Sequence, residues 1–468
     1  MDDSLSQAVE TALSPRTEAA EPQESQRRRR GIPVAEAAIP RPKHVDHHLW
    51  GTYLLLVFIA IVELFSASIQ DVRGDDIFDP ILRHGGFLVV GFLLMLFIQH
   101  VHYRYVYAAI PIYVIASICL LLAVVVGGES INGAVRSIKI AGIQIMPAEF
   151  MKLAAALGTA WILSQTQMPG KRDVTWAGLA CCLGFMFLSC GLLFSQGLSN
   201  TILVVAISFS MMLVAGMGMK KFFIALLITG VLGGSAVYVK TKFVSKENIS
   251  DYQIQTLALN HEESEGRASG RGEVWKQRVK NHFRDNKYND KITSENQQEI
   301  YSYMAQAHGG LFGVGPGKSR ENARLPLASL DYIYAIIIEE LGLFAGLGIL
   351  IVYMWILGRS AKLTVQFRHT MPGIMVMGCA FVIVFQALFH MSIVSGVIPV
   401  SGQPLPLISK GGISVLATSL AFGVMLSCAK HAARTTDTKA EQAKEKEILP
   451  ENARSINPVA ISNVDTKN

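Results

Sequence analysis

The chain is 468 residues long; 51% of its residues are hydrophobic, only 17% are charged, and the formal net charge is +6. A soluble globular domain carries about a quarter charged residues, so this composition excludes an ordinary soluble protein. The mean hydropathy is +0.35, and the apolar residues form long unbroken runs, which predicts a membrane protein. Its excess of basic residues is expected in cytoplasmic loops, so no nucleic-acid partner is expected.

Residues 1–45 are polar, rich in Ala, Glu, Ser, Gln and Pro, and contain the run Arg27-Arg28-Arg29-Arg30. No cleavable signal peptide is visible in this segment. Its composition predicts a disordered cytoplasmic tail whose basic part lies beside the inner leaflet of the membrane.

Ten apolar windows follow, each close to the length of about 20 residues that crosses a bilayer. They lie near 49–69, 84–99, 106–126, 147–165, 175–194, 200–217, 221–239, 332–357, 371–393 and 412–429. The sequence therefore predicts an all-α polytopic membrane domain over residues 46–432, with about ten transmembrane helices. All six cysteines lie inside apolar runs without metal-ligand spacing, so they are expected to be small hydrophobic residues.

The Lys and Arg residues of the short loops indicate the orientation, because cytoplasmic loops carry an excess of them. With the N-terminus inside, the inner loops hold Arg104, Lys171, Arg172, Lys220, Lys221, Arg359, Lys362 and Arg368. The short outer loops hold only Arg73, Arg136, Lys139 and Lys410. We therefore expect both termini in the cytoplasm, one large extracytoplasmic loop over 240–331, and a second disordered cytoplasmic tail over 433–468.

The end of the long loop is rich in glycine and then in basic residues. The glycines between Gly309 and Gly317 permit tight turns and close approach to a ligand, and Lys318, Arg320 and Arg324 follow them. Backbone N–H groups together with these cations could hold a pyrophosphate. A flexible re-entrant turn would have the same composition, so the pattern alone leaves both interpretations open.

Asp331 stands directly before the eighth apolar run and so at the outer mouth of the predicted eighth helix. An Asp at that place could simply cap the helix and interact with its dipole. A carboxylate at a membrane boundary could equally act as a general base towards an attacking sugar hydroxyl. The residues alone favour neither role.

Glu339 and Glu340 lie within the same apolar run, roughly 12–14 Å deeper than Asp331 by helical rise. Carboxylates inside a bilayer are costly and face a polar interior. We therefore expect a structural role for both, as ion pairs with a basic residue such as Lys152 or Arg136. Glu63 in the first helix is expected to snorkel or to pair in a similar way.

Two further segments are expected to meet at a hydrated cavity. Glu149 and Lys152 lie one turn apart at the start of a short apolar helix. The last outer loop, over 396–412, is dense in Pro and Gly, and non-helical backbone at membrane depth is tolerated only where protein or water covers it. This loop is therefore expected to fold back towards the same cavity.

Taken in order, several segments resemble the SEDS family of shape, elongation, division and sporulation proteins, which includes FtsW, RodA and SpoVE. The resemblance covers most of residues 46–432. The matching segments are Phe65 to Ser68, Gly133 to Arg136, Pro147 to Lys152, Gly309 to Gly315, Asp331 to Ala335, Glu339 to Gly342 and Pro399 to Gly412. Several motifs in a fixed order are far more specific than any one of them.

The resemblance implies a peptidoglycan glycosyltransferase of the bacterial cytoplasmic (inner) membrane, which polymerises lipid II into glycan strands at the outer face. In this family the catalytic acidic residue occupies the position of Asp331, which implies that Asp331 is the general base. The resemblance also indicates residues that could bind the donor, namely Arg136, Lys152, Lys318, Arg320, Ser409 and Gly411.

The resemblance also implies partners. The family works with a class B penicillin-binding protein, a transpeptidase, and with other division proteins. A divalent cation such as Mg²⁺ or Mn²⁺ would suit a pyrophosphate leaving group, but no ligand cluster in the sequence identifies a cofactor. The long N-terminal tail favours the division branch, FtsW, over the elongation branch.

The sequence departs from the family pattern at four places. Ser137 replaces a Trp, Ser195 to Thr201 replaces a Q-P-D-x-G-T segment, Leu330 replaces a Thr or Ser, and Lys410 replaces a Tyr. Two alternatives to an enzyme therefore stay open. One is a transporter that flips lipid-linked precursors through the same polar cavity, and the other is an inactive scaffold that recruits division partners.

Overall fold

A computed structural model describes most of the chain from Val45 onwards. The described residues are 45–70, 78–127, 129–131, 134–140, 143–168, 173–194, 196–243, 282–283, 292, 296–325 and 328–457. The predicted N-terminal tail lies outside them up to residue 44, as does most of the first half of the predicted long loop.

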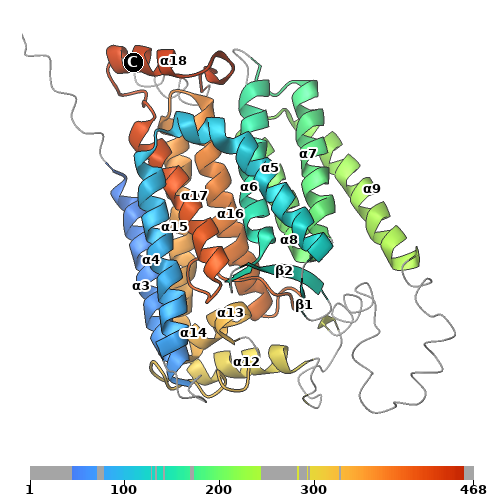
Figure 1. The fold of residues 1–468 in the computed structure, drawn as a ribbon, viewed down its shortest axis with the longest axis vertical. Coiled ribbons are helices and arrows are strands. Elements are labelled where there is room, and N and C mark those ends of the chain that lie inside the picture. Colours follow the sequence, from blue (N-terminus) through green and yellow to red (C-terminus); the bar gives the residue numbers. More distant parts are fainter. Residues whose placement is uncertain are drawn as a thin grey trace, which may run out of the picture. The chain divides into compact units, whose positions relative to one another are not determined.

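Among the described residues, seven helices are long and apolar enough to cross a membrane. They are α3 (His47–Gln70), α4 (Phe78–His100), α5 (Tyr103–Gly127), α7 (Trp176–Phe194), α15 (Leu343–Gln366), α16 (Thr370–Val394) and α17 (Gly412–His431). Three more helices stand beside them (Figure 1): α6 (Pro147–Thr166), α8 (Leu198–Val214) and α9 (Met219–Phe243). The helical, multi-pass membrane fold is thereby confirmed, whereas the number of ten spans and their orientation stay predictions.

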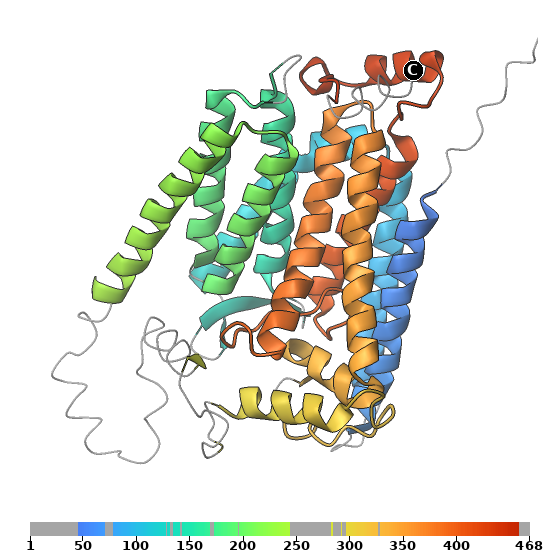
Figure 2. The same ribbon diagram turned by 180° about the vertical axis from the view of Figure 1, so that it is seen from behind.

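Helices α16 and α17 form the centre of the bundle. In each of them 83% of the most apolar window is buried, against 22% to 44% in the other five membrane-length helices. α17 packs against α4, and α16 packs against α6, α8 and α15. Figure 2 shows α9 at the edge of the bundle, beside α7 and α8. Because protein surrounds α16, this helix can carry polar side chains within the membrane.

Short helices lie across the two ends of the bundle (Figure 1). One end, which we call the α12 end, carries α12 (Gln297–Gly309), α13 (Ala328–Asp331) and α14 (Ile333–Leu341). The opposite end, which we call the α18 end, carries α18 (Lys439–Ile448) and the 3-10 turn η2 (Glu451–Ala453).

The predicted eighth helix over 332–357 is wrong at its start. The chain first forms the short helix α14, breaks at Gly342, and begins the long helix α15 at Leu343. Gly342 has a φ of +87°, and a Cβ there would lie 2.3 Å from the carbonyl oxygen of Leu311, so only glycine fits. Glu339 and Glu340 therefore precede the membrane-length helix and do not lie deep within it.

A small antiparallel sheet between α5 and α6 departs from the all-α expectation. It consists of β1 (Glu129–Ile131), β2 (Ala134–Ile140) and β3 (Ile143–Ile145), in the order β1-β2-β3. Ile138 lies opposite Ile145, and Ile140 opposite Ile143. Isoleucine alternates with polar residues here, which is the period of a strand.

The chain after α17 also departs from the expected disordered tail over 433–468, because it keeps defined structure up to Asn457. Thr438 begins α18 with a capping box. Glu445 is buried and accepts hydrogen bonds from the Tyr103 hydroxyl at 2.6 Å and the Ala433 N–H at 2.9 Å. The Asn457 side chain binds two carbonyls at the end of α15. These contacts offset the conformational entropy that the segment loses when it becomes ordered. Its polar composition alone suggested that this loss would keep the segment disordered.

Candidate functional site

Asp331 is the last residue of the four-residue helix α13. The next residue, Tyr332, has φ −129° and ψ 16° and stands at the N-cap of α14. Asp331 therefore precedes the N-cap position of α14 by one residue, so its role as a helix cap stays a prediction. Its half-buried carboxylate lies against Gly402, where a Cβ would come within 2.7 Å of Asp331 Oδ2. The loop backbone can approach the carboxylate this closely only because residue 402 is glycine.

The loop over 395–411, which joins α16 to α17, holds α13 in place. Ser409 is buried, and its hydroxyl donates to the carbonyl oxygen of Leu330 at 2.7 Å. The same hydroxyl accepts the N–H of Leu405 at 2.7 Å. The Tyr353 hydroxyl of α15 donates to Pro406 O at 2.6 Å. Because Leu330 directly precedes Asp331, these bonds fix the backbone that carries the carboxylate.

Ser409 and Gly411, both indicated as substrate-binding by the resemblance, have contacts within the chain itself. The Ser409 hydroxyl donates one hydrogen bond and accepts another there. The N–H of Gly411 donates to Ser409 O at 2.7 Å, and its carbonyl accepts from Val415 N at 3.0 Å as α17 begins. The geometry gives both residues a part in shaping the loop beside Asp331.

A buried polar cluster lies beside this loop. Lys152 of α6 is fully buried, and its ammonium donates to Glu149 Oε1 at 2.7 Å, Gln386 Oε1 at 2.8 Å and Gln403 Oε1 at 3.4 Å. An ammonium has three N–H donors, so each of them has an acceptor. This satisfaction offsets part of the cost of burying the charge. The cluster confirms that 147–152 meets the 396–412 loop, but Lys152 does not pair with Glu339 or Glu340.

Gln403 connects the cluster to two further helices. Its side-chain amide donates to Ser199 Oγ at 3.1 Å and Asn200 Oδ1 at 2.8 Å, both in α8. The backbone carbonyl oxygen of Gln403 lies 2.6 Å from Nδ1 of His390 in α16. Neither His390 nor Gln386 was singled out from the sequence. Their signal is the spacing of four residues, which puts two polar side chains on one face of an otherwise apolar span.

The Gly-rich loop after α12 wraps around the break between α14 and α15. The N–H groups of Val314 and Gly315 donate to the carbonyls of Glu339 and Glu340, each at 2.9 Å. A Cβ on Gly313 would lie 2.2 Å from Glu340 O. The loop thus satisfies carbonyls at the end of α14. Because these N–H groups are already bonded within the chain, they do not form the anion cradle that the glycines suggested.

Glu339 and Glu340 hold the same loop from the inside. Glu339 accepts hydrogen bonds from the Ser319 hydroxyl and, at 3.0 Å, from the Arg320 N–H. Glu340 accepts the Ser66 hydroxyl of α3 at 2.5 Å. Burial raises the pKa of Glu340, although the Ser66 hydroxyl and nearby backbone N–H groups oppose the shift. The structural role of the pair stays a prediction. Its hydrogen-bond partners are hydroxyls and backbone N–H groups in place of Lys152 or Arg136, and the basic side chain nearest to Glu339 Oε1 is His308, with Nδ1 at 3.8 Å.

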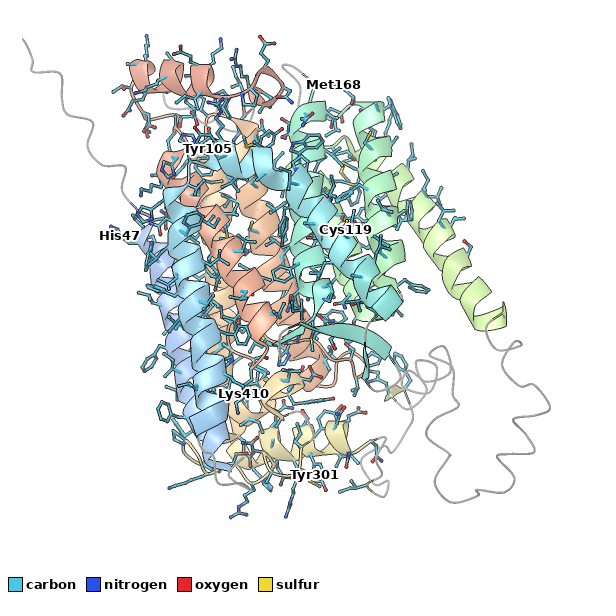
Figure 3. The ribbon with its side chains drawn as sticks, in the orientation of Figure 1. His47, Tyr105, Cys119, Met168, Tyr301 and Lys410 are labelled. Carbon is cyan, nitrogen blue, oxygen red and sulfur yellow. The ribbon has the colours of Figure 1, made fainter. Side chains whose placement is uncertain are left out.

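The remaining predicted cations come from separate elements. Lys318 and Arg320 follow the Gly-rich loop, and both have exposed side chains. Arg136 lies in β2, although its side chain is outside the described residues. Lys410 projects near α13 at the same end of the bundle, above Tyr301 of α12 (Figure 3). The described part of the chain contains no group of three or more His, Cys, Asp or Glu that could hold a metal ion.

Comparisons with known proteins identify relatives over most of the chain. The sequence model of the family described as cell cycle protein, FtsW/RodA/SpoVE, matches residues 46–434. Stage V sporulation protein E of Bacillus subtilis is 28% identical over 388 residues, which cover 81% of this chain and 95% of that protein. A probable peptidoglycan glycosyltransferase FtsW of Alcanivorax borkumensis is 26% identical over 400 residues, which cover 82% and 92%.

The fold also matches solved structures. One match is a chain of a peptidoglycan synthase complex, described as coordinating polymerization and crosslinking, with a TM-score of 0.59 and 23% sequence identity. The match covers 84% of this chain and 99% of that one. At this level of identity, the likeness concerns the fold.

Proposed function

The chain belongs to the FtsW, RodA and SpoVE family of cell cycle proteins, and from this premise we propose that it is a peptidoglycan glycosyltransferase. It polymerises lipid II into glycan strands at the outer face of the bacterial cytoplasmic membrane. A relative of 26% identity is named for that activity. The observation in the structure that supports the proposal most is the half-buried carboxylate of Asp331, held against the 395–411 loop.

Asp331 acts as the general base of the transfer. The 4-hydroxyl of the acceptor's GlcNAc attacks C1 of the donor's MurNAc, and the proton of that hydroxyl passes to the Asp331 carboxylate. A new C1–O bond forms while the bond from C1 to the pyrophosphate oxygen breaks, and undecaprenyl pyrophosphate leaves with the electron pair. The Ser409 hydrogen bond and the close approach of Gly402 keep the base in position before substrate arrives.

Exposed cations at the α12 end bind the donor pyrophosphate. Lys318 and Arg320 have the exposure that this role needs, and Arg136 of β2 is a third candidate. Lys152 instead positions Gln403, because its three donors are all used inside the chain. A divalent cation such as Mg²⁺ or Mn²⁺ would suit the pyrophosphate leaving group, although the described residues contain no group of three or more His, Cys, Asp or Glu that could hold one.

The α12 end faces the outside, and both termini lie in the cytoplasm. The short loops rich in Lys and Arg support this orientation. The growing strands are crosslinked by a class B penicillin-binding protein bound to this chain. The fold shared with a chain of a peptidoglycan synthase complex supports such a partner. The long N-terminal tail favours a place among other division proteins.

The buried charges favour a second candidate function, a flippase for lipid-linked precursors. Charged groups inside membrane proteins frequently mark transport paths, and Glu149 and Lys152 are such groups. Both are bonded within the cluster, to each other and to Gln386. A network satisfied in this way suits a fixed support for the 395–411 loop better than a path that must open.

The two functions are separated by supplying labelled lipid II to the purified chain together with its partner transpeptidase. We expect glycan strands from the wild type and a rate lower by about 10²–10⁴-fold from Asp331→Asn, which keeps the shape of the side chain but removes the base. Lys318→Ala should lower activity by raising KM, because this cation contacts the pyrophosphate. A wild type that makes no strands yet moves lipid II across vesicles would support the flippase instead.

A further inference from the structure

His390 is a fully buried histidine in the second half of α16, and the proposed transfer chemistry does not use it. Its Nδ1 lies 2.6 Å from the carbonyl oxygen of Gln403. A carbonyl oxygen can only accept, so Nδ1 carries the proton and donates it. Nε2 has no hydrogen-bond partner among the described residues. The imidazole is therefore a neutral donor aimed at one loop carbonyl.

That carbonyl lies one residue after Gly402, the residue of the 395–411 loop that lies against Asp331. Gln403 follows Gly402, whose backbone is so close to Asp331 that a Cβ would come within 2.7 Å of Oδ2. The side chain of Gln403 is held by Lys152 and by two residues of α8. The hydrogen bond from His390 holds the Gln403 backbone, and the next carbonyl, of Pro404, accepts from Gln386 Nε2 at 3.1 Å. A shift of Gly402 would therefore change the immediate surroundings of the Asp331 carboxylate.

We propose that His390 is a positioning residue for Asp331, acting through Gln403 and Gly402, and this inference rests on the proposed glycosyltransferase function. The donated hydrogen bond fixes the backbone at 402–403, and the backbone fixes the distance between the carboxylate and the acceptor hydroxyl. His390 acts through the backbone rather than on the substrate, because its side chain is fully buried and its Nδ1 donates to the loop. Misplacing a reacting group by about 1 Å costs about 10²-fold in rate.

Two substitutions separate the effect of the hydrogen-bond donor from the effect of the imidazole ring as a whole. His390→Asn retains an N–H donor near the position of Nδ1, whereas His390→Leu has a similar volume and no donor. The Leu variant leaves the buried Gln403 carbonyl without its partner, which the loop can relieve only by moving. His369→Leu is the matched control. His369 is also buried, its Nδ1 also lies beside a backbone carbonyl (Ser455 O, 3.3 Å), and it stands at the opposite end of α16.

The experiment measures polymerisation of labelled lipid II by the full chain with its partner transpeptidase, per molecule of folded protein. We expect kcat to fall about 10²-fold for His390→Leu with KM nearly unchanged. His390→Asn should keep kcat within about threefold of wild type, because the hydrogen-bond donor to the loop is retained. His369→Leu should keep kcat, because its carbonyl partner lies far from Asp331. Gly402→Ala should reproduce the kcat loss of His390→Leu.

A second measurement does not depend on turnover. The rate at which a water-soluble carbodiimide labels Asp331, followed by mass spectrometry on the folded protein, should change in His390→Leu and stay at the wild-type value in His390→Asn and His369→Leu. The positioning role is wrong if His390→Leu leaves both kcat and this rate unchanged, or if His390→Asn loses as much as Leu. If the wild type makes no strands while the labelling pattern is as expected, the proposed function fails and the positioning contact stands.

Discussion

The two ends of the bundle stabilise their buried charges in different ways. At the α18 end, Asp46 is paired with Arg359, whose Nη2 lies 2.5 Å from Oδ2. At the α12 end, Glu339 and Glu340 are as deeply buried, but hydroxyls and backbone N–H groups make their hydrogen bonds. The basic side chain of His308 lies farther off, with Nδ1 3.8 Å from Glu339 Oε1. The first arrangement is an ion pair between neighbouring helices, and the second fastens a loop around a helix break. We infer that the α18 end serves stability, while the α12 end uses its polar groups to shape the site.

Lys152→Met should give the largest effect, because it breaks the polar cluster from within. Removing one partner of a buried pair leaves Glu149 charged and unpaired, which costs about 3–5 kcal/mol. The yield of folded protein and the thermal midpoint in detergent should both fall. The double variant Glu149→Gln/Lys152→Met removes both charges and should recover much of the midpoint. A single variant as stable as wild type would show that the cluster is not a support.

Gly313→Ala should rank next. Gly313 has a φ of +79° and faces a backbone carbonyl, whereas Gly310 has a φ of +54° and open space around it. Alanine at a positive φ is strained by about 1–3 kcal/mol at either position. Gly310 has a ψ of −145°, a conformation largely confined to glycine, and at 313 the displacement of α14 is added to the strain. Gly310→Ala is thus the matched control. Equal losses of thermal midpoint in the two variants would contradict the packing of this loop against α14.

Ser409→Ala should have a smaller effect on stability and a clear one on activity. It removes the hydrogen bond to Leu330 O and leaves that carbonyl unpaired, at a cost of about 1–3 kcal/mol. The chain should still fold, while kcat falls because α13 is no longer clamped beside the loop. Thr364→Ala is a suitable comparison, since its hydroxyl also bonds backbone carbonyls but near the α18 end. If Thr364→Ala lowers kcat as much as Ser409→Ala, the clamp is not specific.

The pH dependence of stability should have opposite signs at the two ends. Burial alone would raise the pKa of Asp46, but hydrogen bonds from Arg359 and Leu49 N–H lower it below its ordinary value. Its contribution is therefore present above the unfolded pKa, about 3.9, and lost as pH falls through the folded value. The pKa of Glu340 is raised, so its contribution is present below about 4.3 and lost as pH rises through the folded value.

Thermal midpoints across pH test these signs with Asp46→Asn and Glu340→Gln. The first variant should remove part of the loss of stability in acid, and the second should remove part of the loss on raising the pH. These are the smallest effects that we predict, because each concerns a single group. Identical pH curves for the wild type and both variants would contradict the contrast between the two ends.

The sequence predicted the membrane helices well, because an apolar run of about 20 residues matches the thickness of a bilayer and would be costly to expose to water. It could not locate the break before α15, since apolar residues continue on both sides of Gly342 and one glycine is a weak signal. It also missed α18, whose order comes from the contacts of Glu445 and Asn457 with distant residues. Hydropathy carries no information about such tertiary contacts.

The candidate site was predicted in part. The motif order indicated Asp331, and the composition of 396–412 indicated a loop that folds back onto the cluster around Lys152. The roles of individual polar residues required the structure. Ser409 supports the loop, and the Gly-rich segment binds carbonyls of α14. Composition suggested anion binding for that segment, because free and occupied N–H groups cannot be told apart in a sequence.

The most direct measurement is the polymerisation of labelled lipid II by Asp331→Asn, compared with the wild type at equal amounts of folded protein. Loss of a general base predicts a fall in kcat of about 10²–10⁴-fold, with an unchanged thermal midpoint because the shape of the side chain is kept. Strand synthesis at the wild-type rate by the folded variant would contradict the assignment of Asp331 as the base.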